Sequence, residues 1–204
     1  LIVNMGEISS PEGIRPITFE EHNMPLVNDL FHMLVHGFSG RWAHYYLIAL
    51  EELCDEEHTF ILGYEGKPVS MGIVVDYSDE EGGRWGYLYC LTTEEEYRKQ
   101  GLMNRLYREQ IEPTLQSRGY RGVCLVPESD YLLEYYKRWG LELLPRLAEE
   151  EMPDLEIRPG EQAKRYLLSA YGVTSIVNPL PYRMAKFFNE EDRTKRLRLL
   201  SPLD

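Results

Sequence analysis

The stretch Tyr97-Arg98-Lys99-Gln100-Gly101-Leu102-Met103 lies between a strand-like run, Gly86 to Thr93, and an amphipathic run that begins at Leu102. Backbone N–H groups that converge at the first turn of a helix meet phosphate with unpaired donors and with the positive end of the helix dipole. Gly101 lets the main chain approach a ligand closely. The stretch predicts a strand–loop–helix unit with a phosphate-binding loop, although an Arg-x-x-Gly turn also serves as a plain connection.

A second unit follows this loop along the chain. Val123 to Val126 is typical of a buried strand, and Asp130 to Leu141 is typical of a helix in which Tyr136 stands four residues before the terminating Gly140. Two other phosphate-binding motifs are excluded, because the sequence contains neither Gly-x-x-x-x-Gly-Lys-Ser/Thr nor Gly-x-Gly-x-x-Gly.

The two motifs Arg98-x-x-Gly101-x-Met103 and Tyr136-Lys137-Arg138-Trp139-Gly140-Leu141 together resemble the GNAT superfamily of acyl-CoA-dependent N-acetyltransferases. The resemblance covers roughly Ile14 to Leu144. At two positions the chain departs from the family pattern, since Met103 stands where Gly or Ala is usual and Leu141 where Phe is usual.

The resemblance implies an α/β fold with a mixed, mostly antiparallel central sheet that is flanked by helices. Residues 1–144 are expected to form the GNAT-like, acetyl-CoA-binding acyltransferase core. Residues 145–204 are expected to form a C-terminal extension that packs on the same domain. No internal repeat or long linker divides the chain.

The resemblance also implies acetyl-CoA as the acyl donor. Its pantetheine arm is expected to align with the strand that ends at Thr93, with Leu91 and Thr93 as contacts, and its pyrophosphate with the loop that follows. The expected pyrophosphate-binding residues are Arg98, Lys99, Gln100, Gly101, Leu102, Met103 and Asn104. Backbone donors dominate this site, while Arg98 and Lys99 add positive charge.

Tyr136 is the candidate general acid. A phenol with an ordinary pKa of about 10 can protonate a departing thiolate. By analogy with cysteine, the thiol that forms has a pKa of about 8.5. Tyr135 lies about 100° round the same helix, so the two side chains are expected to occupy different environments. The alternative for Tyr136 is a core aromatic residue.

Candidates for the base are less distinct. Glu94, Glu95 and Glu96 follow the cofactor strand and serve either as a base, directly or through water, or as a solvated surface turn. Tyr87 and Tyr89 are candidates for the acceptor side. His32 and His36 have the spacing of half a metal site, but no third ligand is evident, so no metal site is predicted. A covalent route through Cys90 is disfavoured, because a cysteine within an apolar strand is normally inert.

Composition limits the function classes. The chain has 204 residues and a formal net charge of −12, from 34 acidic against 22 basic residues. This charge argues against nucleic-acid binding and favours a cationic or neutral partner, or serves solubility alone. Cys54, Cys90 and Cys124 are expected to be buried free thiols. Neither a signal peptide nor an apolar run of membrane-spanning length is evident, so a cytoplasmic protein without membrane contact is expected.

Hydrophobic periodicity predicts the remaining elements. It predicts a strand at Ile14–Thr18, helices at Glu20 to about Val35 (with Met24 on its apolar side) and around Trp42–Leu53, and a hairpin of Thr59–Tyr64 and Val69–Tyr77. Pro113 is expected to kink or restart the helix after the loop. Toward the C-terminus the expectations are an acidic link at 148–154, a helix at 161–171, strands at 173–177 and 183–188, and a frayed tail at 193–204.

These observations predict an N-acetyltransferase in which an amine attacks acetyl-CoA directly. The acceptor is a small-molecule or peptide amine that the sequence does not identify, because acceptor pockets are built from variable loops. One alternative is a non-catalytic acyl-CoA sensor or interaction module that retains the fold. Another is a dimeric scaffold, a homodimer through the aromatic C-terminal part.

Overall fold

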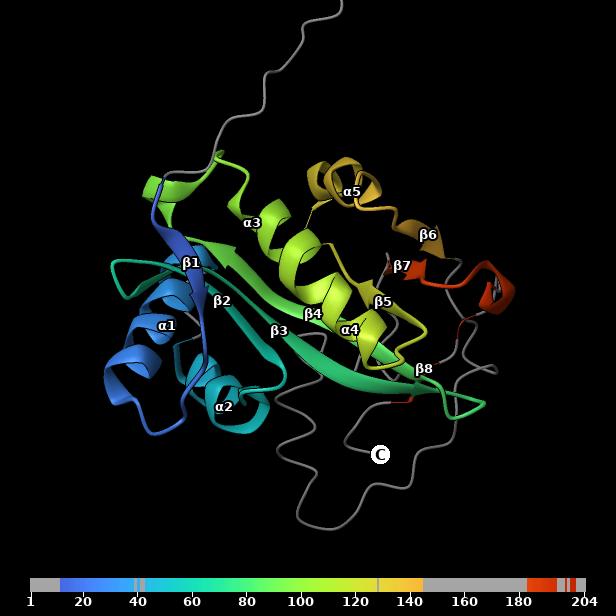
Figure 1. Cartoon of the computed structure of the whole chain (residues 1–204), viewed down its shortest axis with the longest axis horizontal. Coiled ribbons are helices and arrows are strands. Elements are labelled where there is room, and N and C mark those ends of the chain that lie inside the picture. Colours follow the sequence, from blue (N-terminus) through green and yellow to red (C-terminus); the bar gives the residue numbers. More distant parts are fainter. Residues whose placement is uncertain are drawn as a thin grey trace, which may run out of the picture. The chain divides into compact units, whose positions relative to one another are not determined.

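The computed structural model describes residues 12–38, 40, 43–127, 129–144, 183–193, 197 and 199–200 (Figure 1). The strands are β1 (Ile14–Ile17), β2 (Thr59–Tyr64), β3 (Lys67–Asp79), β4 (Arg84–Thr93), β5 (Gly122–Leu125), β6 (Glu142–Leu144), β7 (Arg183–Phe187) and β8 (Leu199–Leu200). The α-helices are α1 (Met24–Gly37), α2 (Ala43–Leu53), α3 (Leu102–Arg105), α4 (Glu112–Ser117) and α5 (Asp130–Lys137). A π-helical segment, η3 (Leu106–Ile111), joins α3 to α4, and short 3₁₀ turns are η2 (Glu95–Tyr97) and η5 (Glu190–Asp192).

The strands follow the order β1-β2-β3-β4-β5-β7-β6, and β8 pairs with β3. The pair β4–β5 is parallel, whereas β1–β2, β2–β3, β3–β8, β5–β7 and β6–β7 are antiparallel. The predicted mixed, mostly antiparallel sheet with flanking helices is therefore confirmed. Close contacts divide the chain into two compact units, of which the first comprises residues 1–73 and 90–112 and the second residues 74–89 and 113–204.

In the first unit, the hairpin of β2 and β3 has a shorter turn than predicted. Tyr64 pairs with Lys67, so only Glu65 and Gly66 form the turn. Both have positive φ, 49° and 82°, which is the backbone conformation of a tight two-residue hairpin. The predicted hairpin is confirmed, and β3 begins at Lys67.

Helix α1 begins later than predicted. The Asn23 side chain accepts a 3.1 Å hydrogen bond from the Leu26 N–H and so caps the helix, and a proline occupies its first turn. The buried face consists of Leu26, Leu30, Met33 and Leu34. The prediction that Met24 faces inward is wrong, because it lies about 200° round the helix from Leu26 and is 66% exposed.

Helical segments cover both faces of β4 in the first unit. A Cβ on Gly72 would lie 2.7 Å from Leu91, with Ile111 of η3 next to it, whereas a Cβ on Gly37 of α1 would lie 2.2 Å from the Thr92 hydroxyl. Side chains of adjacent strand residues point to opposite faces of a sheet. The segment after the loop therefore packs on the Leu91 face, and the end of α1 packs on the Thr92 face.

The helix after the loop is continuous from Leu102 to Ser117 and changes its winding in the middle. The Glu112 N–H bonds to the Tyr107 carbonyl, five residues back, which gives the wider turn of a π-helix. Regular α-helix resumes beside Pro113, which has no N–H to offer, and the predicted restart is confirmed. Of the positions expected on the apolar side of this helix, Leu102, Leu106, Tyr107, Ile111 and Leu115 are buried, whereas Met103 is half-buried.

In the second unit, segments from the C-terminal part belong to the sheet. Strand β7 lies between β5 and β6, where Ala185 pairs with Cys124 on one side and Glu142 on the other. The predicted frayed tail is wrong at its centre, because Leu197 and Leu199 are buried and β8 pairs with Ser78–Asp79 of β3. The predicted segments at 148–154, 161–171 and 173–177 lie outside the described residues. Among those described, no helix is both long enough and apolar enough to cross a bilayer.

Candidate active site

The loop before α3 has the backbone of a close-approach site. Gly101 adopts a left-handed conformation (φ 75°, ψ 6°) directly before the first helical residue, and Lys99 has a φ of 62°. A Cβ on Gly101 would meet no atom within 4 Å. The Met103 side chain, which the sequence places at an unusual position, therefore does not fill the space in front of Gly101. The main chain is therefore open on the side where a Cβ of residue 101 would stand.

Two side chains fold back to fasten this loop. Arg98 Nε donates a 2.9 Å hydrogen bond to the carbonyl oxygen of Thr93, the last residue of β4. Gln100 Nε2 donates a 3.0 Å hydrogen bond to the carbonyl oxygen of Glu96. Arg98 fastens the loop to the end of β4, and Gln100 fastens it to the turn η2. The contact of both residues with pyrophosphate stays a prediction.

The other residues predicted to bind acetyl-CoA differ in how far their side chains are exposed. Leu102 is 1% exposed, so its side chain belongs to the core and only its backbone N–H is available to a ligand. Lys99 and Asn104 are exposed, whereas Leu91 and Met103 are half-buried.

At the end of β4, the Thr93 hydroxyl lies 2.9 Å from the Ser70 hydroxyl of β3. The Ser70 hydroxyl also donates a 3.4 Å hydrogen bond to the Thr92 carbonyl oxygen. One residue further on, the Glu94 N–H donates to the Val69 carbonyl oxygen at 2.9 Å. The backbone of Thr93 and Glu94 is therefore held against β3.

In the second unit, Tyr136 is the buried residue of α5, with 9% of its surface exposed. Its ring lies 5.2 Å from that of Trp139 and 5.5 Å from that of Tyr135, both in edge-to-face geometry. Tyr135 also contacts Trp139 at 5.2 Å, so the expectation of separate environments is wrong. The reason is that Trp139 lies three and four residues after the two tyrosines, where helix side chains meet. Burial raises the pKa of Tyr135 to about 12.

A cleft of about 660 Å³ opens in the first unit beside the end of β4. Three segments line it: α1, the β2–β3 hairpin and the stretch after β4. The lining residues are Asp29, His32, His36, Tyr64, Glu65, Lys67, Pro68, Val69, Glu94, Glu95, Glu96, Tyr97 and Arg98. The fold thus brings His32 and His36 to the same cavity as Glu94 to Glu96, although nothing in the sequence links the two groups.

The sequence does not identify several of the lining residues as site residues. Asp29 of α1 and Tyr64 and Lys67 of the hairpin belong to no motif and come from segments far apart in the chain. A pattern within one helix or strand cannot indicate which face of α1 meets which hairpin. In the described part of the chain, no group of three or more His, Cys, Asp or Glu side chains is arranged to hold a metal ion.

The other candidate residues from the sequence, Tyr87 and the cysteines, lie in the core. Tyr87 is 4% exposed and packs 5.5 Å from Tyr77, so it is a core residue of the second unit. The three cysteines are buried and free, as predicted. Burial raises the pKa of Cys54 to about 12, which makes that thiol a poor nucleophile.

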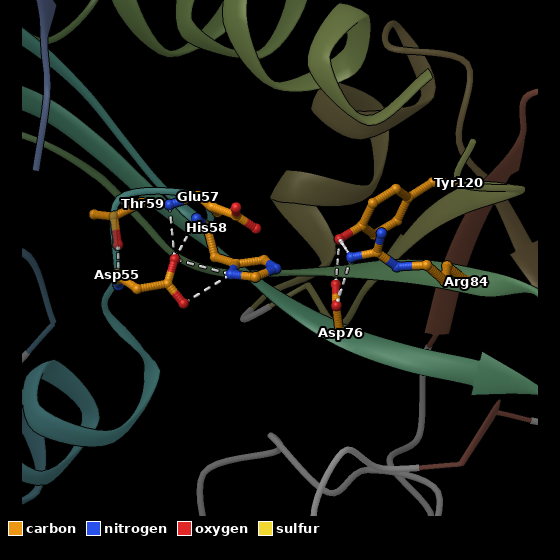
Figure 2. Close-up of polar contacts among 7 residues, drawn as sticks. All are labelled: Asp55, Glu57, His58, Thr59, Asp76, Arg84 and Tyr120. Carbon is orange, nitrogen blue, oxygen red and sulfur yellow. Dashed lines mark hydrogen bonds and ion pairs between the residues drawn. The ribbon is translucent and has the colours of Figure 1, made fainter. Parts of the chain in front are cut away.

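Figure 2 shows two further polar clusters, each within one unit. In the first unit, Asp55 Oδ1 accepts the Glu57 and His58 N–H groups at 2.8 and 2.7 Å, and Asp55 Oδ2 lies 2.8 Å from His58 Nδ1. The Asp55 N–H donates to Thr59 Oγ1 at 3.2 Å. These bonds shape the turn that leads into β2.

In the second unit, Arg84 of β4 donates to Asp76 Oδ2 of β3 at 2.8 Å and to the Tyr120 hydroxyl at 2.7 Å (Figure 2). The Tyr120 hydroxyl in turn donates to Asp76 Oδ1. The Arg84 guanidinium also lies over the Tyr120 ring, 4.3 Å from its centroid. This cluster fastens the residues before β5 to β3 and β4, and its polar groups satisfy one another.

Comparison with known proteins gives the family. A sequence profile of the acetyltransferase (GNAT) family matches residues 27–143, more than half of the chain. No curated protein sequence matches the chain.

Solved structures share the fold at low identity. The protein PH1933 of Pyrococcus horikoshii OT3 is similar with a TM-score of 0.58 and 14% identity, over 86% of this chain and 99% of that one. The GNAT-family N-acetyltransferase YhbS of Escherichia coli, solved in complex with CoA, is similar with a TM-score of 0.51 and 18% identity, over 64% of this chain and 69% of that one. A GCN5-related N-acetyltransferase of Kribbella flavida is longer, and this chain covers 34% of it (64% of this chain, 15% identity, TM-score 0.49).

The profile match begins within α1 and ends within β6, so it includes β4, the Gly101 loop and α5. The chain belongs to the acetyltransferase (GNAT) family.

Proposed function

We propose that the protein is an N-acetyltransferase that moves the acetyl group of acetyl-CoA to a primary amine by direct attack. Family membership supports acetyl transfer in general. The observation that carries the proposal is the open, left-handed Gly101 at the start of a helix that continues to Ser117. A long helix preceded by an unobstructed glycine favours a bound diphosphate.

The residues present fit the acyl donor. The backbone N–H groups from Gly101 onward hold the pyrophosphate, and the Arg98 and Lys99 side chains add positive charge. Gln100, Leu102, Met103 and Asn104 complete this segment. The strand end at Leu91 and Thr93 orients the amide-containing pantetheine arm by its backbone groups, because carboxyl ends of strands are common ligand sites in α/β sheets.

Proton transfer falls to two side chains in this proposal. Acetyl-CoA supplies a thioester carbonyl for attack and a thiolate that departs. The Tyr136 hydroxyl donates a proton to the departing sulfur. The Glu94 carboxylate, the first of the three that follow β4, accepts the proton of the attacking amine, directly or through one water.

Two measurements test the proposal. Calorimetry with coenzyme A measures binding, and thiol release from acetyl-CoA across a panel of primary amines measures turnover. We expect binding in the micromolar range and amine-dependent thiol release. Absence of binding at millimolar coenzyme A would overturn the donor site, whereas binding without turnover on any amine would overturn the enzymatic role.

A further inference from the structure

The cleft of the first unit indicates which amines the site accepts. We propose that it binds an acceptor with a second positive charge beside the reacting amine, such as an aliphatic diamine. This inference rests on the proposed acetyl transfer and adds a substrate class to it. The volume of about 660 Å³ suits a chain of several carbons, since small-molecule sites commonly measure roughly 300–1,000 Å³.

The charged residues of the cleft are unevenly divided. Five of the lining residues carry a carboxylate, whereas two, Lys67 and Arg98, carry a permanent positive charge. The carboxylates come from all three walls: Asp29 from α1, Glu65 from the hairpin turn, and Glu94, Glu95 and Glu96 from the stretch after β4. Arg98 Nε is engaged by the Thr93 carbonyl oxygen. The cleft therefore favours cations over neutral ligands and disfavours anions.

An aromatic pair in the same cleft gives independent support. The rings of Tyr64 and Tyr97 lie 6.3 Å apart and are tilted by 48°, and both residues line the cavity. The face of an aromatic ring attracts ammonium groups, and an anion gains nothing from it. Apolar side chains would suit an uncharged acceptor better than these two phenols among carboxylates.

The position of the cleft indicates where each of the two amino groups of the acceptor lies. The reacting amine is assigned to the end at Glu94, because Glu94 directly follows the strand that is proposed to orient the pantetheine arm. The second ammonium then lies among Glu95, Glu96 and the Tyr64–Tyr97 pair. The net charge of −12 adds long-range attraction for a dication at low ionic strength.

Three amines of similar length test the proposal with acetyl-CoA as donor: 1,5-diaminopentane, pentylamine and 6-aminohexanoate. The expected kcat/KM for the diamine exceeds that for pentylamine by about 10-fold or more, and 6-aminohexanoate falls below pentylamine by a similar factor. The diamine preference is expected to shrink at high salt. Equal kcat/KM for the three amines would overturn the proposal.

Variants locate the preference. Glu95→Gln/Glu96→Gln is expected to reduce the diamine-to-pentylamine ratio to about 2-fold or less, because the second ammonium loses its partners. The control Glu51→Gln/Glu56→Gln removes the same charge at exposed positions outside the cleft and is expected to retain the ratio. A ratio that stays unchanged in the first variant would overturn the assignment to this cleft.

Direct binding separates this inference from the proposed function. Calorimetry with 1,5-diaminopentane alone, without acetyl-CoA, measures the cleft without turnover. Binding that Glu95→Gln/Glu96→Gln weakens, in a protein that acetylates no amine, would retain the cation site and remove the enzyme. Turnover on amines with no charge preference and no diamine binding would retain the enzyme and remove the cation site.

Discussion

Arg98 Nε and the Thr93 carbonyl oxygen form a 2.9 Å hydrogen bond that fastens the loop before α3 to the last residue of β4. The strand end is proposed to orient the pantetheine arm and the loop to hold the pyrophosphate. Because one side chain joins the two, the separation of the two subsites depends on it.

Arg98→Lys is expected to weaken coenzyme A binding by about 3- to 10-fold. Lysine keeps the positive charge but lacks the planar fork that reaches the carbonyl oxygen, and one such hydrogen bond contributes about 0.5–1.5 kcal/mol. Calorimetry measures the change. The control Arg15→Lys, at an exposed position of β1, is expected to leave the Kd unchanged. An unchanged Kd in Arg98→Lys would show that the bond does not organise the donor site.

Gly101→Ala separates backbone strain from ligand access. An alanine at φ 75° costs about 1–2 kcal/mol of stability, and its methyl group enters the open space where the phosphate would approach. Gly82→Ala is a matched control, since Gly82 has a φ of 80° and equally open surroundings in the β3–β4 turn. Urea unfolding is expected to show a similar loss in both variants. Only Gly101→Ala is expected to weaken coenzyme A binding, by about 10-fold or more.

Local elements of the fold are predictable because their signals lie within a few residues. The apolar spacing after Leu102 and the Glu65-Gly66 turn each predict an element that the structure contains. Strand β8 is not predictable in this way. Leu199 and Leu200 become a strand because they pair with Asp79 and Ser78, and nothing near the C-terminus indicates that partner.

The candidate site likewise has one part that the sequence predicts and another that it does not. The Gly101 loop is one contiguous segment, so its left-handed glycine follows from the sequence. The cleft depends on the packing of α1 against the hairpin and the end of β4, which brings Asp29 near Tyr97. The spacing of His32 and His36 does not indicate which segments lie opposite α1, so the sequence alone does not place the pair in a cleft with Glu94 to Glu96.

Tyr136→Phe is expected to lower kcat by about 100-fold or more while sparing coenzyme A affinity. The phenyl ring preserves the edge-to-face contacts with Trp139 and Tyr135 and removes only the hydroxyl. Tyr135→Phe is the matched control, because its ring packs on the same tryptophan at the same 5.2 Å distance. A Tyr136→Phe enzyme with wild-type kcat, measured by thiol release at saturating acetyl-CoA, would remove Tyr136 from the mechanism.

Tyr120→Phe tests the polar cluster that joins β3, β4 and the residues before β5. The change removes the hydroxyl that donates to Asp76 and accepts from Arg84, and is expected to lower the free energy of unfolding by about 1–3 kcal/mol. Tyr131→Phe, at a position that is 82% exposed, is expected to change it little. Burial, followed by the hydrogen bond to Asp76, raises the pKa of Tyr120.

The raised pKa gives this variant a pH signature. A phenol whose pKa is higher in the folded state stabilises the fold fully below its unfolded pKa of about 10, and this contribution declines as the pH rises toward the folded pKa. Wild-type stability is therefore expected to fall more steeply above about pH 10 than that of Tyr120→Phe. Tyr107 and Tyr135, whose pKa values are also raised, contribute equally to both proteins, so the difference in slope isolates Tyr120. Parallel stability curves between roughly pH 8 and 11 would show that the Tyr120 hydroxyl is not held in its protonated form by the fold.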